Sequence, residues 1–209
     1  MGSSQLWNQN GKEYNKGMVE LRNIEVYDFI ESVIACRNAV SVEIPYYSKE
    51  NFDEALIRAN KLAKLGGGTG HSNFRKGIRV SFDIKYPNYF SPELQRYSFI
   101  DIVCSSSKMH KIMTMDFDKC CNKYVLSSTK GIMKEIIAEY NQNKSYELFM
   151  KVISNCPQGL ELFMRISTNY EQLATIYRQR KSHKLKEDWG VFCDMIEKLP
   201  YSKELITGW

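Results

Sequence analysis

A cluster of cationic side chains at the end of one predicted helix is the part of the sequence best suited to bind an anion. Arg178 and Arg180 lie two residues apart, so they point to different sides of a helix and at least one is available to a ligand. Guanidinium groups bind phosphate oxygens through two parallel hydrogen bonds and stay charged when desolvated. Tyr170 or Tyr177 on the same helix can stack on a nucleotide base. The other members of the cluster are Lys181, His183, Lys184 and Lys186.

A solvated helix end is the alternative explanation for these cations, because the free carbonyls at a helix C-terminus attract positive charge. The net charge of +5 is a mild excess, and the cations concentrate in residues 178–186. Proteins that bind nucleic-acid polymers usually carry a stronger basic patch with interleaved aromatic residues. We therefore expect a small anionic nucleotide ligand as the partner and no nucleic-acid polymer.

Other motifs resemble reactive or binding sites but lack a required feature. The glycine-rich segment 66–72 follows a predicted helix, precedes a strand, and has His71 in place of the lysine of a phosphate loop. A serine run, Ser105–Ser107, with His110 lacks the Gly-x-Ser-x-Gly elbow of a hydrolase. The cysteines form no Cys-x-x-Cys pair and the three histidines are scattered, which argues against a structural metal site.

Composition indicates one globular domain. The chain has 209 residues, of which 43% are hydrophobic and 25% charged, and no apolar run approaches the about 20 residues that a membrane helix needs. The opening Met-Gly-Ser-Ser is typical of a cloning remnant, so we expect an N-terminal extension over residues 1–18 and a single domain over 19–209. Unpaired cysteines and the lack of a secretory signal predict a cytoplasmic protein.

The clearest predicted strand spans residues 78–86, where apolar and polar side chains alternate. Such alternation indicates an antiparallel sheet that is covered on one face only. Further strands are predicted over 19–27 and 40–44, with a short helix over 28–37 between them. Ser48 is suited to cap a helix over about 50–65.

Helices are predicted through most of the remaining chain. Ser91-Pro92-Glu93 is a typical helix start, and the apolar run that follows predicts a buried helix over 94–104. Residues 105–125 are expected to form a loop with short turns. Further helices are predicted over 130–140, from Ser145 to 153, from a cap at Thr168 or Asn169 to about 181, and over 189–199.

The C-terminal part of the chain resembles the signature of the flavin-dependent thymidylate synthases, the ThyX family. Asn169 opens a helix, Leu173 follows four residues later, Arg180 lies at the end of the helix and Glu187 enters the next one. In that family these positions hold an Asn, a Leu, a substrate-binding Arg and a Glu. The resemblance implies an α+β fold, a mixed domain with a largely antiparallel sheet packed by helices. It also implies a homotetramer with nucleotide pockets between subunits.

The chain departs from the family at its most specific motif. Aligning strand 78–86 on the family pattern places His71 and Asn73 on its His-x-Ser pair. The same ungapped placement puts Phe99–Asp101 on the diagnostic Arg-His-Arg and 109–112 on its Ser-x-Arg-Tyr. In the family these cations hold the flavin and the nucleotide close together. Their replacement removes positive charge and adds a carboxylate, which argues against thymidylate synthesis.

We therefore predict a non-catalytic nucleotide-binding protein on a ThyX-like fold, with no cofactor. A compact, diverged chain of this kind suits a phage-encoded sponge or sensor of a nucleotide signal. The residues expected to bind the nucleotide or its phosphate are His71, Asn73, Arg96, Asn169, Tyr177, Arg178, Arg180 and His183.

Two alternatives remain open from the sequence. The first is a flavin-dependent thymidylate synthase or related flavoenzyme that uses FAD and dUMP, with Arg96 and Lys111 replacing the lost cations. The second is a structural or assembly protein in which residues 178–186 form only a solvated helix end.

Overall fold

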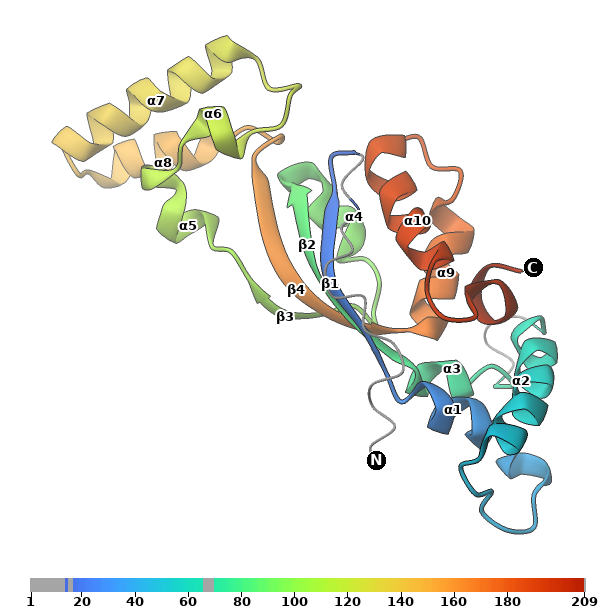
Figure 1. Cartoon of the computed structure of the whole chain (residues 1–209). Coiled ribbons are helices and arrows are strands. Elements are labelled where there is room, and N and C mark those ends of the chain that lie inside the picture. Colours follow the sequence, from blue (N-terminus) through green and yellow to red (C-terminus); the bar gives the residue numbers. More distant parts are fainter. Residues whose placement is uncertain (1–13, 15–16, 66–69, 209) are drawn as a thin grey trace.

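A four-stranded antiparallel sheet forms the centre of the fold (Figure 1). The computed structural model describes residue 14, residues 17–65 and residues 70–208. The sheet has the order β1-β2-β4-β3, and helices pack against it, as the predicted α+β class requires. The strands are β1 (Glu20–Tyr27), β2 (Arg79–Pro87), β4 (Glu161–Asn169) and β3 (Asp101–Ser105).

One face of the sheet is buried because successive side chains of a strand point to opposite faces. Val80, Phe82 and Ile84 of β2 are fully buried, as is Ile166 of β4. The Phe82 ring meets the Phe192 ring edge-on at 5.7 Å between centroids, which places helix α10 (Val191–Glu197) over this face. The opposite face is polar, as the alternation over 78–86 predicts.

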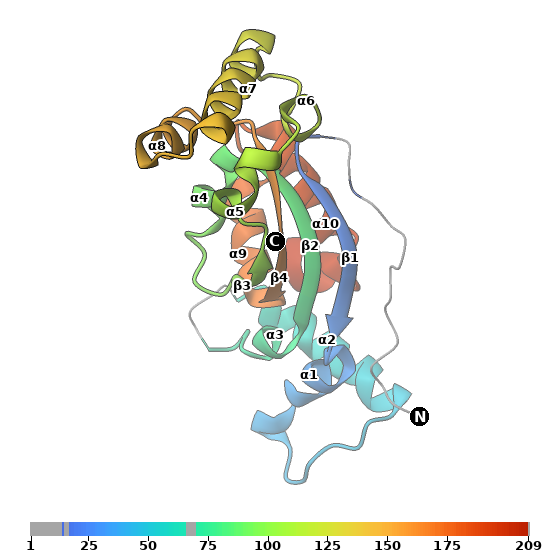
Figure 2. The ribbon, with the colours of Figure 1, turned by 90° about the vertical axis from the view of Figure 1, so that its left-hand side faces the viewer.

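Helices gather at both ends of the sheet and over its buried face (Figures 1 and 2). One end carries the hairpin of α7 and α8 with α5 and α6, and the other end carries α1, α2 and α3. The remaining bounds are α1 (Phe29–Ala35), α2 (Lys49–Ala63), α3 (Phe74–Gly77), α4 (Ser91–Leu94), α5 (Lys108–Lys111), α6 (Phe117–Cys120), α7 (Ser127–Gln142), α8 (Tyr146–Ser154) and α9 (Tyr170–Arg180). Short 3-10 turns span Asn38–Val40, Asn88–Phe90 and Ile112–Thr114, and π-helical turns span Lys186–Gly190 and Lys203–Thr207.

Three predicted helix starts are capped in the structure. The side chains of Ser48, Ser145 and Asn169 accept hydrogen bonds from the backbone N–H groups of residues 51, 148 and 172, at the starts of α2, α8 and α9. Each bond satisfies one N–H that has no partner inside its helix. Local sequence therefore fixes where these helices begin.

Two element predictions are wrong. The expected buried helix over 94–104 is instead the single turn α4, a loop, and strand β3, whose five residues are all exposed. The β-branched residues Ile102 and Val103 suit a strand, and β4 offers β3 an antiparallel partner. The expected strand over 40–44 finds no partner strand among the described residues and is an exposed loop after a 3-10 turn.

Two sequence predictions fall partly on residues that the structure does not describe. Residues 66–69 of the glycine-rich segment lie outside the described residues, and the short helix α3 separates that segment from β2. The predicted extension 1–18 also lies mostly outside them. Of its members, Tyr14 pairs with Leu21, and the Met18 N–H donates to the Glu187 carbonyl at 2.8 Å.

A buried arginine of α3 joins this helix to α9 and to the C-terminal segment. Arg75 of α3 is 1% exposed, and its guanidinium contacts the Glu171 carboxylate of α9 at 2.6 Å. It also donates a hydrogen bond of 3.0 Å to the carbonyl of Leu205 near the C-terminus. Three segments that are distant in sequence therefore meet at one side chain.

Replacing Arg75 by Ala is expected to lower the free energy of unfolding by about 3–5 kcal/mol, because the Glu171 carboxylate would stay largely buried without its partner. Urea denaturation of both proteins measures the change. The matched control is Lys76→Ala, since Lys76 is the exposed neighbour on the same helical turn. Equal losses in the two variants would contradict a structural role for this ion pair.

Candidate functional site

The structure divides the predicted nucleotide-binding residues between the two ends of α9. Asn169 lies at the N-terminal end, where it caps the helix, and α3 packs beside it through the ion pair of Arg75 with Glu171. His71 and Asn73 are exposed in the turn before α3. The helix has eleven residues, so its two ends lie about 16 Å apart.

The second group lies at or near the C-terminal end of α9. Arg178 is exposed, whereas Arg180 and His183 are partly buried. Arg96 is exposed in the loop after α4, and the Tyr177 hydroxyl donates to the Glu197 carboxylate at 2.6 Å. The eight predicted residues therefore do not form one site within a single chain.

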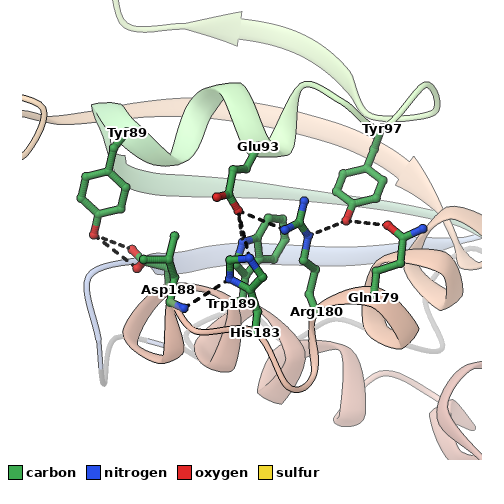
Figure 3. Close-up of polar contacts among 9 residues, drawn as sticks. Tyr89, Glu93, Tyr97, Gln179, Arg180, His183, Asp188 and Trp189 are labelled. Carbon is green, nitrogen blue, oxygen red and sulfur yellow. Dashed lines mark hydrogen bonds and ion pairs between the residues drawn. The ribbon is translucent and has the colours of Figure 1, made fainter.

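The carboxylate of Glu93 is the centre of a polar network at this end of α9 (Figure 3). It accepts a hydrogen bond of 2.7 Å from the indole N–H of Trp189 and one of 3.2 Å from Arg180. The imidazole Nε2 of His183 lies 3.8 Å from the same carboxylate oxygen. These contacts tie α4 to α9 and to the turn that precedes α10.

Arg180 is held by contacts within the chain. Its guanidinium carbon lies 4.6 Å from the centroid of the fully buried Trp189 ring, and its Nε donates to the Tyr97 hydroxyl at 2.7 Å. Its Nη1 donates to Glu93, whereas Nη2 makes no hydrogen bond to the described residues. This geometry orients one face of the guanidinium rigidly, and the assignment of Arg180 to nucleotide binding stays a prediction.

A buried acid extends the network. Asp188 is 2% exposed and accepts hydrogen bonds of 3.1 and 3.2 Å from the Tyr89 hydroxyl. Burial raises the pKa of Asp188 to about 6, the Glu187 and Glu93 carboxylates add to that rise, and the Tyr89 hydrogen bond opposes it. Burial and the Asp188 carboxylate raise the pKa of Tyr89 well above its usual range, so this hydroxyl remains a donor.

Asp188 makes the stability of the fold depend on pH. Because its folded pKa is raised, the folded state holds the proton more tightly than the unfolded state, and stability falls as pH rises from about 4 through about 6. We expect Asp188→Asn to be more stable than the parent protein above that window, by on the order of 2–3 kcal/mol, with no difference below it.

Denaturant unfolding measured from about pH 4 to pH 7 tests this expectation. Asp194→Asn is the control, because Asp194 is an exposed acid on α10. A stability difference for Asp188→Asn that does not change with pH would contradict the assignment.

A second candidate site is a cavity of about 890 Å³ on the polar face of the sheet, away from α9 and α10. Strands β1, β2 and β4 form its floor, and the end of β3 with α5 forms one wall. Four cations, two carboxylates, His110 and three consecutive serines contribute to it. The polar lining residues are Glu20, Arg22, Asp83, Lys85, Ser105, Ser106, Ser107, His110, Lys111 and Arg165.

Most cations of this sheet-face cavity already have carboxylate partners. Lys85 contacts Glu161 at 2.6 Å, and Arg165 contacts both Asp83 and Glu25 at 3.4 and 3.5 Å. Among the described residues, Lys111 has no carboxylate partner; its ammonium instead lies 6.0 Å from the centroid of the Phe163 ring. Lys111 is therefore the cation of the cavity that is best placed to meet an added anion.

Hydrogen bonds of Ser106 and Ser107 fix the wall of the cavity, and other polar groups of the serines stay available to a ligand. Ser106 exchanges two bonds with Phe163: the Ser106 N–H donates to the Phe163 carbonyl at 2.8 Å, and its hydroxyl accepts from the Phe163 N–H at 3.0 Å. Ser107 caps α5 by accepting from the His110 N–H. Phe163 is 58% exposed, so much of this aromatic residue is accessible to solvent.

Sequence reasoning did not select this cavity. Ser105–Ser107 with His110 were weighed as a hydrolase site, and Lys111 was named as a replacement cation under the flavoenzyme alternative. The missed signal is the alternation of Leu162, Met164 and Ile166 with Phe163 and Arg165, which marks β4 as a strand with one polar face. That strand brings Phe163 beside the serine run.

Comparisons with known proteins place the fold. No family model and no curated protein matches the chain. A solved structure of ThyX from Helicobacter pylori, complexed with FAD and dUMP, matches with a TM-score of 0.66 and 12% identity, over 88% of this chain and 96% of that one. This chain has a ThyX-like fold. A second Helicobacter pylori ThyX structure with FAD and dUMP matches with a TM-score of 0.64 and 12% identity, over 92% and 98%.

The ThyX-like fold agrees with the resemblance that the sequence carries, although identity is too low for the fold to establish activity.

A cluster of metal ligands and a membrane-spanning helix are both absent from the part of the chain that the structure describes. There, no three His, Cys, Asp or Glu side chains gather as metal ligands would. No helix in that part is both long and apolar enough to cross a membrane.

Proposed function

We propose that this protein binds a nucleotide in the sheet-face cavity of its ThyX-like fold and carries out no flavin chemistry there. The observation that carries the proposal is the pairing of Lys111 with the exposed Phe163 ring, beside three serines. Solved proteins of this fold are complexed with dUMP and FAD, which supports a nucleotide as the ligand class.

The cavity has groups for each part of a nucleotide. The Lys111 ammonium supplies positive charge for a phosphate, and the serine hydroxyls and the His110 imidazole next to it can donate hydrogen bonds to the phosphate oxygens. The Phe163 ring supplies a surface on which a base can stack. Asp83 and Glu20 can accept hydrogen bonds from sugar hydroxyls.

The absence of flavin chemistry is proposed from charge. Phe99, Ile100 and Asp101 stand where the resembled family has Arg-His-Arg, and Asp101 is exposed at the start of β3. A carboxylate at that position repels the diphosphate of a flavin cofactor instead of binding it. A protein that binds a nucleotide without reaction would act as a sensor or a sponge of a nucleotide signal, which suits a phage-encoded protein.

The test uses dUMP as the probe. Lys111→Ala is expected to weaken dUMP binding by about tenfold or more, because a phosphate would lose its unpaired cation in the cavity. Isothermal titration calorimetry measures the affinity. The matched control is Lys184→Ala, which removes one positive charge from the exposed cluster after α9 and should leave the affinity within about twofold.

Three outcomes would overturn this assignment. If Lys111→Ala binds as the parent protein does while Arg180→Lys loses binding, the nucleotide lies at the end of α9. If the purified protein carries a yellow flavin, or oxidises reduced flavin only when dUMP is present, the flavoenzyme alternative holds. Absence of dUMP binding, together with absence of binding to other mononucleotides, would favour the structural alternative.

A further inference from the structure

Another cavity, of about 830 Å³, lies at the end of the sheet that carries α1 and α2, and we call it the acidic cavity. Its lining comes from the starts of α1 and α2 and from residues 199–204, where the chain leaves α10 for the C-terminal π-helical turn. That turn lies beside α2 (Figure 1). Among the described residues, none lines both this cavity and the sheet-face cavity. Its volume is within the range of pockets that bind small ligands.

Three aromatic side chains of the lining pack against one another. The Phe29 ring stacks on the Tyr201 ring, with 5.5 Å between centroids and 18° between planes. The Phe52 ring meets the Tyr201 ring edge-on at 5.8 Å and lies 6.2 Å from the Phe29 ring. All three residues remain partly exposed. This aromatic cluster therefore offers the cavity an apolar surface for the hydrocarbon part of a ligand.

The charged side chains of the lining are mostly acidic. Four carboxylates face one ammonium group, and these residues are Asp28, Glu31, Asp53, Glu204 and Lys49. The chain as a whole has a net charge of +5, so the cavity carries the opposite sign to the rest of the protein. A concave surface lined by charges of one sign attracts ligands of the other sign, which here means a cation.

Three of the four carboxylates have no partner among the described residues. The Lys49 ammonium contacts the Asp53 carboxylate at 2.6 Å, so the single cation of the lining is already paired. Within the described part of the chain, the side chains of Asp28, Glu31 and Glu204 make no ion pair and no hydrogen bond. Glu31 and Glu204 are also partly buried, which removes part of their hydration. Ammonium groups of a ligand would supply the missing partners.

The backbone has an unusual conformation at two residues of the lining. Asp28 and Tyr201 have φ angles of 54° and 49°, in the left-handed region that residues other than glycine rarely adopt. Asn23 is the only other such residue in the described part of the chain. Backbone strain of this kind costs stability and is concentrated at ligand sites in proteins. The strain therefore agrees with a binding role for the acidic cavity, which the aromatic cluster and the unpaired carboxylates indicate independently.

We propose that the acidic cavity binds a linear polyamine, a chain of methylene groups that carries two or more ammonium groups. The ammonium groups donate hydrogen bonds to the unpaired carboxylates, and the methylene groups lie against the aromatic cluster. The unpaired carboxylates come from two elements, the start of α1 and the C-terminal turn, so a ligand with several ammonium groups satisfies them better than one lysine side chain of a protein partner.

Two other ligand classes fit the acidic cavity less well. A quaternary ammonium ion has no N–H to donate to a carboxylate, and the three rings pack on one another instead of surrounding a cation. A nucleotide phosphate would be repelled by the carboxylates. The polyamine site is therefore independent of the nucleotide proposed for the sheet-face cavity, and either proposal can fail without the other.

A series of amines tests the ligand class on the unaltered full chain. Isothermal titration calorimetry should show spermidine binding with one molecule per chain, and putrescine binding more weakly. Butylamine has the carbon chain of putrescine with a single ammonium group, and its affinity should be about tenfold or more below that of putrescine. No binding of spermidine, or equal affinities for putrescine and butylamine, would overturn the proposal. Tighter binding of tetramethylammonium or of a trilysine peptide would also overturn it, in favour of a quaternary ammonium ion or a basic protein partner.

Charge-neutralising substitutions test the location of the site. Glu31→Gln and Glu204→Gln should each weaken spermidine binding about tenfold, because each removes a charged acceptor while keeping the shape of the side chain. The matched control is Glu147→Gln, which removes the same charge from an exposed position on α8 at the other end of the fold and should change the affinity less than about twofold. Equal losses in all three variants would indicate diffuse attraction of the polyamine and would contradict binding in the acidic cavity.

Discussion

The antiparallel pairing of β2 with β4 is the constraint on which the rest of the structure depends. Nine residue pairs, from Arg79 with Asn169 to Pro87 with Glu161, fix the register of the two central strands. Because side chains alternate, that register places Phe82 and Ile166 under α10 and leaves Lys85, Phe163 and Arg165 on the other face. A shift of this register by one residue would move the buried side chains to the cavity face and turn the cavity residues toward the core.

The two faces of the sheet differ in how their charged side chains are paired. On the helical side, several charged and polar groups pair within the chain, with Glu93 joining Trp189 and Arg180 and with Arg75 joining Glu171. Removing one member of such a pair destabilises the fold, because the other polar group stays buried without its partner. On the polar side, Lys111 retains charge without a carboxylate partner among the described residues. This contrast is why we place the nucleotide on the polar side, while the strongest sequence match, Arg180, lies on the helical side.

Local signals predicted much of the fold. Caps at Ser48, Ser145 and Asn169 and the alternation over 78–86 identified elements whose boundaries depend on neighbouring residues. Strand β3 could not be predicted in this way, since a short apolar run fits a helix or a strand and pairing with the distant β4 decides between them. The candidate site was missed for the same reason. Lys111 and Phe163 are 52 positions apart in the sequence, and only the β3–β4 ladder brings them together.

Hydrogen–deuterium exchange with and without dUMP tests the central claim most directly, because it locates the ligand without any substitution. The account predicts slower exchange in residues 105–111 and 161–165, which border the sheet-face cavity. It predicts no change in residues 169–184, which include α9 and most of the cationic cluster. Protection confined to residues 169–184 would contradict the placement of the nucleotide and would restore Arg180 as its binding residue.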